Sequence, residues 1–297
     1  MRLFLALLLF SSSSFAQVSV TYMQDDSLHT VIGERYKSGY FFNAPNSTQT
    51  IHVVTLDWPP YIGNKLCNKG WVYQFSTAIL HSAGYSAYIE FVPWARAVRS
   101  VELGKADVLM PEYYIEDTAP SDYIEGKTRR KLLGLSNSFE GGNIGFLKRK
   151  GEPDRFNGNL KSLKGSRIGV VRGYQNTPEF DAMMDNNEFI IINAVDDLQL
   201  VKLLAAKRVD LIIGDPAVLL YSVKYAALPD SEKQTLLSAI EPESKAIQYN
   251  PLYFAISKKT PNWLTVLEDI NTALYKFKNS GETQRMKQAL LNECDQL

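Results

Sequence analysis

The sequence predicts an α/β protein of two lobes, each built on a mostly parallel sheet with helices on its faces. Between residues 51 and 110, short apolar runs alternate with segments whose apolar residues recur every three or four positions. A polar break at 148–158 precedes a second alternation of the same kind at 167–225. Strands that alternate with helices form parallel sheets, because each helix carries the chain back across a face of the sheet. Two such series predict two lobes.

The first series begins at Ile51–Leu56, an apolar run that stops at Asp57 and two prolines and is typical of a buried strand. Trp71 to Ser82 then has the spacing of a helix with one inward face, and Gly84 ends it. The next predicted elements are a strand at 88–92, a helix at 93–103 and a strand at 107–110. Ligands of such sheets bind beyond the carboxyl ends of the strands.

The second series begins with a predicted strand at 167–171. Thr177, Pro178 and Glu179 then match a helix start, with a cap, a first-turn proline and an acid that faces the helix dipole. The alternation continues through 189–192, 198–206, 210–214 and 216–225.

A last strand and two helices close the chain, at 252–257, 261–278 and 282–293. Because they are too few for a third domain, we expect them to complete the first lobe, so that two chain crossings act as a hinge. The predicted division is 51–143 plus 247–297 for lobe 1 and 144–246 for lobe 2. Residues 17–50 are polar without a sustained period, and we treat them as an N-terminal extension of uncertain structure.

Residues 1–16 match a secretory signal peptide. Arg2 gives a positive start, residues 3–10 are apolar, and Ser14-Phe15-Ala16 places small residues where signal peptidase cleaves, so the cut is expected before Gln17. An uncleaved anchor or a buried first helix is the alternative, although the apolar run is too short to span a bilayer. With no cysteine after the cut for lipid attachment, the sequence predicts a periplasmic protein free in solution.

Composition excludes several classes of partner and cofactor. The 32 Lys and Arg balance the 32 Asp and Glu of the 297-residue chain, so no net charge attracts nucleic acid or an anionic membrane. The sequence holds no phosphate-binding loop, no dinucleotide glycine pattern and no glycine-flanked nucleophilic serine, and we expect no cofactor. Three scattered histidines and two cysteines make a zinc site unexpected. The class of partner that remains is a small-molecule ligand. We expect the protein to bind it as a monomer.

Cys67 and Cys294 are predicted to form a disulfide, because disulfides persist in secreted proteins. Closing so long a loop would restrict the unfolded chain by roughly 5 kcal/mol in the loop-entropy model. Two free buried thiols remain the alternative, since spacing in the sequence does not give their separation.

The candidate ligand-binding residues of the first lobe lie where predicted strands end or the next helix begins. Trp58 and Tyr61 follow the first strand, where two prolines fix an extended turn that holds both rings toward a cleft or packs them on the core. Trp94 and Arg96 begin the next helix; Trp94 suits cleft or core, and Arg96 suits an anionic group. Aromatic faces favour organic or cationic ligands.

Glu112 and Tyr113 directly follow the strand at 107–110, where Glu112 meets a ligand or is a solvated loop acid. In the second lobe, Arg172-Gly173-Tyr174-Gln175-Asn176 links a strand to a helix start, whose free N–H groups favour a carboxylate. Arg172 could add a bidentate contact. Asp215 follows an apolar strand and pairs with a ligand amine or caps the next helix.

The order of several short motifs resembles that of the family-3 extracellular solute-binding proteins, the amino-acid-binding type of periplasmic binding protein. The resemblance covers about Ile51 to Met286. It rests on Trp58-Pro59-Pro60-Tyr61, on residues 91–97 and 104–107, on 163–165 with 168–174, and on 208–211 and 251–257. It implies the type II periplasmic-binding fold, in which two α/β lobes joined by a two-strand hinge close on a ligand.

Position by position, Asp215 matches the family's acid for the ligand α-amino group, and Arg172 to Asn176 match its loop for the α-carboxylate. Tyr61 and Trp94 fall where family members line the pocket. The family's carboxylate-binding arginine, however, falls at Ala119.

Either another arginine replaces the family's carboxylate-binding arginine, or the ligand is not an ordinary α-amino acid. The candidate replacements are Arg96, Arg129, Arg130 and Arg172. Glu112 and Asp215, together with several aromatic residues, favour an amine-bearing or polar organic ligand.

The leading hypothesis is a binding protein, not an enzyme, that captures a small polar organic ligand by hinge closure for an ABC importer or a membrane sensor. The ligand is expected to be amino-acid-like or amine-bearing. One alternative is an enzyme on the same scaffold, similar to arogenate or cyclohexadienyl dehydratases, with Glu112 or Asp215 as general acid. Another is a sensory lobe pair that binds a protein, favoured by the segment before Ile51.

Overall fold

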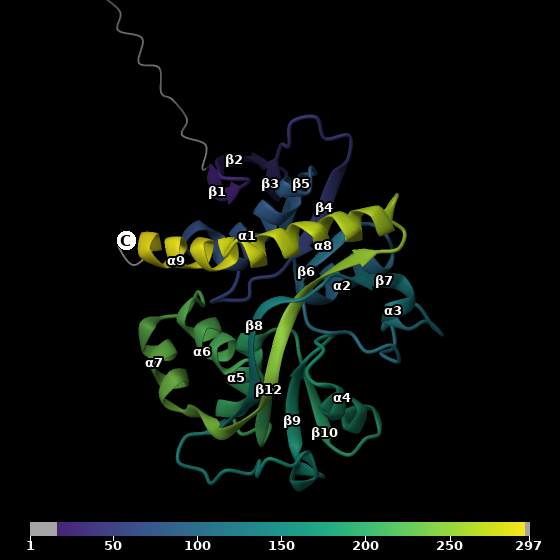
Figure 1. The fold of residues 1–297 in the computed structure, drawn as a ribbon. Helices are drawn as coiled ribbons and strands as arrows, with labels where there is room; N and C mark the ends of the chain where they lie inside the picture. Colours follow the sequence, from purple (N-terminus) through teal and green to yellow (C-terminus); the bar gives the residue numbers. More distant parts are fainter. Residues whose placement is uncertain (1–16, 295–297) are drawn as a thin grey trace, which may run out of the picture.

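The computed structural model describes residues 17–294, and the predicted signal peptide at residues 1–16 lies outside the described residues. The chain forms two lobes, drawn one above the other in Figure 1. Lobe 1 holds the strands β1 (Val18–Gln24), β2 (Ser27–Tyr36), β3 (Gly39–Phe42), β4 (Thr50–Thr55), β5 (Ser86–Phe91), β6 (Val108–Glu112) and β7 (Leu133–Leu135). Its helices are η1 (Cys67–Lys69), α1 (Trp71–Ser82), α2 (Trp94–Glu102), α3 (Arg129–Leu132), α8 (Trp263–Asn279) and α9 (Glu282–Cys294).

The centre of lobe 1 is the strand–helix–strand–helix–strand unit predicted from the sequence. β4 pairs in parallel with β5 on one side and β6 on the other. Right-handed crossovers to opposite sides of β4 place α1 and α2 on opposite faces of the sheet. α8 and α9 pack beside α1 (Figure 1). The carboxyl ends of these strands point toward lobe 2.

Residues 17–50, to which the sequence analysis assigned no strands, extend this sheet. β1, β2 and β3 form an antiparallel meander, and β3 pairs with β5. Val18, Val20 and Tyr22 alternate inward along β1 and are buried. On β2, Leu28 and Ile32 point outward, 64% and 49% exposed, which obscures the alternation in the sequence.

Lobe 2 is the second α/β unit expected from the sequence. Its strands are β9 (Arg167–Val171), β10 (Ile190–Ala194) and β11 (Leu211–Gly214). Its helices are η2 (Leu160–Leu163), α4 (Pro178–Asp185), α5 (Asp197–Ala205), α6 (Pro216–Lys224) and α7 (Asp230–Ser238). β9 lies between β10 and β11 and is parallel to both.

Two long strands, β8 (Phe139–Arg149) and β12 (Ile240–Ser257), run through both lobes. They pair antiparallel, and β8 also pairs with β11 while β12 pairs with β6. Their register shifts between Pro242 and Ala246, between Ala246 and Gln248, and between Asn250 and Leu252. This pair forms the two-strand hinge expected for the fold.

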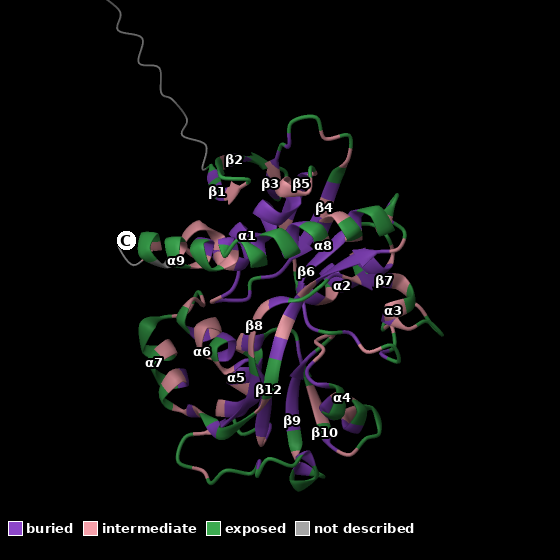
Figure 2. Ribbon diagram, in the orientation of Figure 1, coloured by how far each residue is buried: buried purple, intermediate pink, exposed green. Residues whose placement is uncertain are grey.

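Buried residues line both sheets, and the outer faces of the helices are exposed (Figure 2). One apolar cluster runs from lobe 1 into lobe 2, where it includes Phe146 and Phe180, and a second fills the rest of lobe 2 around Leu200 and Leu219. Within residues 17–294, no helix is both long and apolar enough to cross a membrane.

The predicted disulfide is present between Cys67 in η1 and Cys294 at the end of α9. The two residues are 227 positions apart, and their Cα atoms are separated by 5.8 Å. The bridge therefore fastens the last helix to the loop that precedes α1.

Candidate functional site

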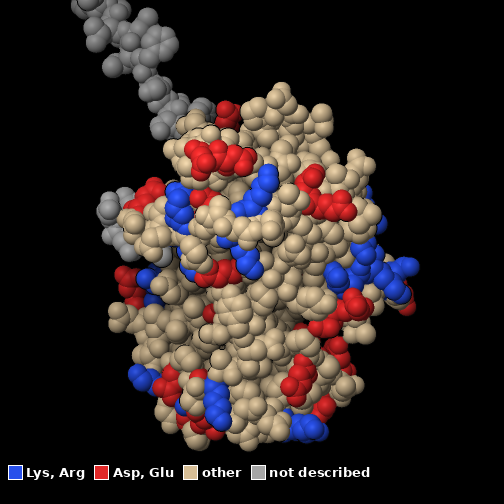
Figure 3. Space-filling view, viewed as in Figure 1, with Lys and Arg blue, Asp and Glu red and all other residues tan. Residues whose placement is uncertain are grey.

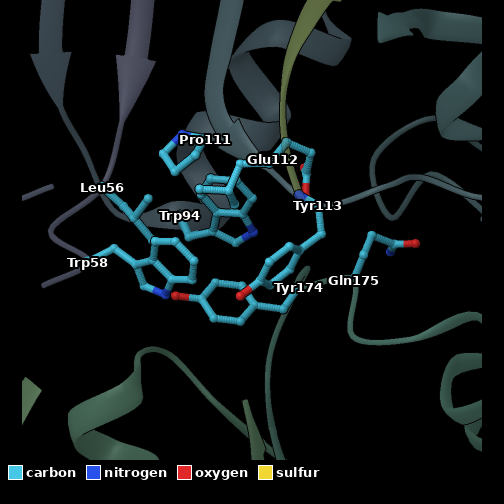
Figure 4. A pocket seen from close by; sticks show the side chains of 9 residues that line it. Leu56, Trp58, Trp94, Pro111, Glu112, Tyr113, Tyr174 and Gln175 are labelled. Atoms are coloured by element: carbon cyan, nitrogen blue, oxygen red, sulfur yellow. The ribbon is translucent and has the colours of Figure 1, made fainter. Parts of the chain in front are cut away.

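Five aromatic side chains converge where the two lobes meet, four of them drawn in Figure 4. The ring of Trp58 stacks on Tyr61 at a centroid distance of 4.7 Å and meets the edge of Tyr113 at 5.6 Å. Trp94 meets Tyr174 edge to face, also at 5.6 Å. We call the small cavity beside these rings the aromatic pocket. It encloses about 20 Å³, lined by Leu56, Trp58, Trp94, Pro111, Glu112, Tyr113, Tyr174, Gln175 and Leu252.

The position of these residues follows from the direction of the strands. Trp58 follows β4, Tyr113 follows β6, and Tyr174 follows β9. Because each sheet has a parallel core, the residues after its strands gather at one edge, and the edges of the two lobes face each other. The sequence-based prediction used this rule, and the structure brings these residues together.

Two hydrogen bonds join the lobes across the aromatic pocket. The Tyr61 hydroxyl donates to Asp215 Oδ2 at 2.7 Å, and Trp94 Nε1 donates to the carbonyl oxygen of Gly173 at 2.9 Å. Gly142 of β8 leaves room for the first, since a Cβ there would lie 2.0 Å from the Tyr61 hydroxyl and 2.1 Å from Asp215 Oδ2. The two lobes are therefore in direct contact in this structure.

Asp215 has one of the two roles considered from the sequence, that of a helix cap. Its Oδ1 accepts from the Ala217 N–H at 2.8 Å and caps α6, while Oδ2 accepts from the Tyr61 hydroxyl. The side chain is buried, which raises its pKa, and the hydrogen bonds from Tyr61 and the α6 backbone oppose that rise.

A second buried acid, Asp197 at the start of α5, adjoins the pocket from lobe 2. Its Oδ2 accepts from the Tyr174 hydroxyl at 2.8 Å. Burial raises the pKa of Asp197 to about 7, although the Tyr174 hydrogen bond lowers it. The Tyr113 hydroxyl is buried and, among the described residues, has no hydrogen-bond partner. Burial and then the charge of Asp215 raise its pKa.

Asp197→Asn is expected to flatten the dependence of stability on pH. Because the folded-state pKa of Asp197, about 7, exceeds its ordinary value of 3.8, the folded protein holds a proton that the unfolded chain has lost. This group therefore lowers stability as pH rises from about 4 to 7. Asparagine does not titrate and still accepts from Tyr174, so the variant should be more stable than the wild type at pH 8, by on the order of 2 kcal/mol.

Urea unfolding of both proteins at pH 4, 5, 6, 7 and 8 measures this effect. The stability advantage of Asp197→Asn should grow with pH and level off above pH 7. An advantage that is the same at every pH would contradict the assignment.

Arg129, one of the candidate replacements for the family arginine, is buried between two glutamates. Its Nε donates to Glu102 Oε1 at 3.0 Å and its Nη2 to Glu112 Oε2 at 2.8 Å. The third nitrogen, Nη1, is buried and has no partner within the described chain. The backbone N–H of Arg129 donates to the Ala119 carbonyl at 2.8 Å, which places the two residues side by side. We call Glu102, Arg129 and Glu112 the arginine cluster.

Burial raises the pKa of Glu112, while the charge of Arg129 and its hydrogen bond lower it. Glu112 is thus neither a free ligand-binding acid nor a solvated loop acid, but the partner of a buried arginine. Its Oε1 accepts from the Tyr113 N–H at 3.0 Å.

A cleft of about 460 Å³ adjoins the aromatic pocket at Tyr174 and Gln175, a size suited to a small organic ligand. Both lobes line it. Its charged lining residues in the described chain are Glu102, Glu116, Asp122, Asp181, Asp185, Arg129 and Arg172. On the face shown in Figure 3, acidic side chains lie at the right, directly below a group of basic ones.

The loop predicted to bind a carboxylate already faces an acid. The Asn176 N–H donates to Asp181 Oδ2 at 3.0 Å, and Asn176 Nδ2 donates to Asp181 Oδ1 at 3.2 Å. Burial raises the pKa of Asp181 to about 7, and these two hydrogen bonds oppose the rise. Two donors of this loop, both on Asn176 just before α4, are thus already bonded to an acid of the protein itself.

The other predicted residues divide between the site and the surface. Arg172 lines the cleft and is exposed. Arg96 is exposed on α2 and is not among the residues that line the cleft or the aromatic pocket. Arg130 contacts the exposed Asp117 at 3.4 Å.

Sequence reasoning did not select Glu102, Asp181 or Asp197. Asp197 stands just after β10 and at the start of α5, so the strand-end rule could have found it. Glu102 and Asp181 lie on helices, where an acid that faces a cleft has the same sequence pattern as a solvated one.

The sequence matches no family model and no curated protein. Solved structures do match. An ancestral arginine-binding protein bound to arginine is similar with a TM-score of 0.62 at 20% identity, over 81% of this chain and 97% of that chain. A histidine kinase sensor domain with similarity to periplasmic binding proteins has a TM-score of 0.64 at 16% identity, over 82% and 96% of the two chains.

An amino acid ABC transporter substrate-binding protein, AbpA from Streptococcus pneumoniae bound to L-arginine, gives a TM-score of 0.60 at 14% identity, over 82% of this chain and 94% of that chain. Likeness at these identities concerns the backbone. This likeness agrees with the two sheets described above, whose central strands are parallel, and with the β8–β12 hinge. The chain therefore has the two-lobed α/β fold of the type II periplasmic binding proteins.

Proposed function

We propose that this protein is a periplasmic solute-binding protein that captures a small polar, amine-bearing ligand by hinge closure. The observation that carries the proposal is the aromatic pocket with its adjoining cleft, which lies between two lobes joined by β8 and β12. The proposed division is 51–143 plus 247–297 for lobe 1, together with the β1–β3 strands, and 144–246 for lobe 2. Residues 1–16 would direct export.

Asp215 is the residue proposed to receive a ligand amine. Its Oδ2 accepts from the hydroxyl of Tyr61, whose ring stacks on the pocket residue Trp58. A carboxylate oxygen accepts more than one hydrogen bond, so an amine can bind beside the Tyr61 hydroxyl when the rings separate. Trp58, Trp94 and Tyr174 supply ring faces that attract a cation. The pocket has room for about one water molecule, so entry of a ligand requires these rings to separate.

Hinge closure would be coupled to binding through the contacts between the lobes. Each of the two interlobe hydrogen bonds contributes on the order of 1 kcal/mol, so the closed state is accessible without ligand. A ligand that touches both lobes binds the closed state better and increases its population by that difference in affinity.

Thermal unfolding against amino acids, amines, organic acids and sugars tests the proposal. A ligand at one hundred times its dissociation constant adds about 2.7 kcal/mol, which shifts the melting temperature by several degrees. One chemical class is expected to give the shift. No shift from any compound, with no small molecule released on denaturation, would contradict a solute-binding function.

Tyr61→Phe tests the closure step, because it removes the hydroxyl that reaches Asp215. Small-angle scattering without ligand should give a larger radius of gyration than the wild type. Tyr85→Phe is the matched control: the Tyr85 hydroxyl donates to Asp269 at 2.5 Å within lobe 1, so this variant should keep the wild-type radius. Equal radii for all three proteins would mean that the Tyr61 bond does not hold the lobes together.

Delivery to an ABC importer and signalling to a membrane sensor both use such a closed lobe pair. The likeness to a substrate-binding protein of a transporter supports the first, and the likeness to a histidine kinase sensor domain supports the second. A turnover assay with arogenate and prephenate tests the enzyme alternative; the proposal expects no product. We take the protein to act as a monomer that binds no nucleic acid and needs no cofactor.

A further inference from the structure

We infer that the cleft selects an organic cation without a carboxylate, so that an amine binds more tightly than the amino acid from which removal of the carboxyl group would derive it. The inference rests on the proposed function and specifies the class of ligand. Four features of the cleft carry it: the charge of the arginine cluster, the occupied loop at Asn176, the excess of acids, and two buried donors without partners.

The arginine cluster offers no positive charge to a ligand. Arg129 contacts two carboxylates at 3.0 and 2.8 Å, and all three side chains are almost fully buried. With both glutamates ionised, one positive charge stands against two negative charges; with Glu112 protonated, the sum is zero. In neither state is the cluster positive, so Arg129 cannot act as the charged clamp for a ligand carboxylate.

In the loop at residues 172–176 of lobe 2, the donors of Asn176 are already hydrogen-bonded. The N–H of Asn176 and its side-chain amide, which could receive a ligand carboxylate, donate to Asp181. A ligand carboxylate placed here would meet an acid of the protein at the same donors. It would have to compete with Asp181 for both donors of Asn176.

The remaining charges favour a cation. Apart from the arginine cluster, the described lining of the cleft carries Glu116, Asp122, Asp181 and Asp185 against the single Arg172, so four acids stand against one base. Like charges across a partly buried site repel and opposite charges attract, so this arrangement rejects anions and attracts cations. Beside the cleft, the ring faces of the aromatic pocket add to the same preference, and so does Asp215, which is bonded to Tyr61 behind Trp58.

Two buried polar groups indicate that a ligand oxygen is also expected. Arg129 is 3% exposed and Tyr113 is 7% exposed, and in the described part of the chain neither Arg129 Nη1 nor the Tyr113 hydroxyl has a partner. Arg129 lines the cleft and Tyr113 lines the aromatic pocket. A neutral hydroxyl or carbonyl of the ligand would satisfy the Nη1 group without bringing a third carboxylate beside Glu102 and Glu112.

Matched pairs of ligands test this inference by isothermal titration calorimetry on the wild-type protein without its residues 1–16. The pairs are agmatine and L-arginine, cadaverine and L-lysine, tyramine and L-tyrosine, and ethanolamine and L-serine. The members of a pair differ only in the carboxylate. We expect at least one amine to bind at least tenfold more tightly than its amino acid. Equal or tighter binding of the amino acid in every pair that binds would overturn the inference.

The double variant Glu102→Gln/Glu112→Gln tests the physical cause. It leaves Arg129 with neutral partners, so the cluster becomes positive and the preference for the amine should fall by at least tenfold. The single variant Glu112→Gln, expected to change the ratio in the same direction, serves if the double variant does not fold. An unchanged ratio in the folded variant would exclude the arginine cluster as the cause and overturn the argument from it.

The two proposals fail in different ways. If the wider compound screen yields a tight ligand that is anionic, neutral or dependent on its carboxylate, the inference of a cation is wrong and the solute-binding function stands. If neither the amines nor any compound of the screen binds, the solute-binding function itself is contradicted.

Discussion

Arg129→Met is expected to lower the free energy of unfolding by about 3–5 kcal/mol at pH 7, because it leaves the buried carboxylates of Glu102 and Glu112 without their counter-charge. Urea unfolding measures the change. Methionine fills a similar volume, so the loss would come from charge more than from packing. The penalty should shrink as pH falls toward 4, since the buried Glu112, deprived of Arg129, is protonated in the folded protein at a higher pH than in the unfolded chain.

Arg130→Met is the matched control for this prediction. Arg130 is the next residue, and its ion pair with the exposed Asp117 is 3.4 Å long, so its loss should cost less than about 1 kcal/mol. The triple variant Glu102→Gln/Glu112→Gln/Arg129→Met should recover much of the stability that Arg129→Met loses. Equal effects of the two single variants would show that the arginine cluster is not a buried ion network.

Removing the disulfide is expected to cost about 2–5 kcal/mol, the second of the large effects. The bridge closes a loop between residues 227 positions apart, and in the loop-entropy model so long a loop restricts the unfolded chain strongly. The double variant Cys67→Ser/Cys294→Ser should therefore unfold at a lower urea concentration than the oxidised wild type.

Reduction of the wild-type protein provides an independent comparison, since it breaks the same bond without changing the sequence. Neither cysteine lines the cleft or the aromatic pocket, so the folded double variant should bind ligand as the wild type does. A loss of stability below about 1 kcal/mol would mean that contacts of α9, such as that of Glu282 with the Met23 N–H at 2.8 Å, already hold the C-terminus in place.

The fold could be predicted where periodicity in the sequence matches burial. The β4–α1–β5–α2–β6 unit was predicted because its strands are buried on both faces and its helices have one apolar face. The strands β1 to β3 were not, because β2 exposes Leu28 and Ile32 while Gly33 occupies an inward position with little hydrophobic signal. β2 is recognised as a strand by its pairing with β1 and β3, not by its own sequence pattern.

The site could be predicted as far as strand ends determine it. Trp58, Tyr113, Tyr174 and Asp215 each stand within three positions of a strand end, and the topology alone brings them to one place. The arginine cluster depends on packing between residues that are distant in the sequence: Arg129 is 27 positions from Glu102 and 17 from Glu112. The sequence named Arg129 as one of four candidates, and only the three-dimensional contacts show that its charge is already compensated.

The path of the chain through β8 and β12 implies an order of assembly. Lobe 2 is one continuous stretch between these strands, whereas the sheet of lobe 1 lacks a strand until the second half of β12 has been made. Synthesis proceeds from the N-terminus, so lobe 2 can fold while lobe 1 is still incomplete. Cys294 is made after every strand of both sheets, and its bond to Cys67 joins residues 227 positions apart. We expect formation of this bond to be the last step of folding, so that lobe 1 would stay incomplete in a chain truncated before α9.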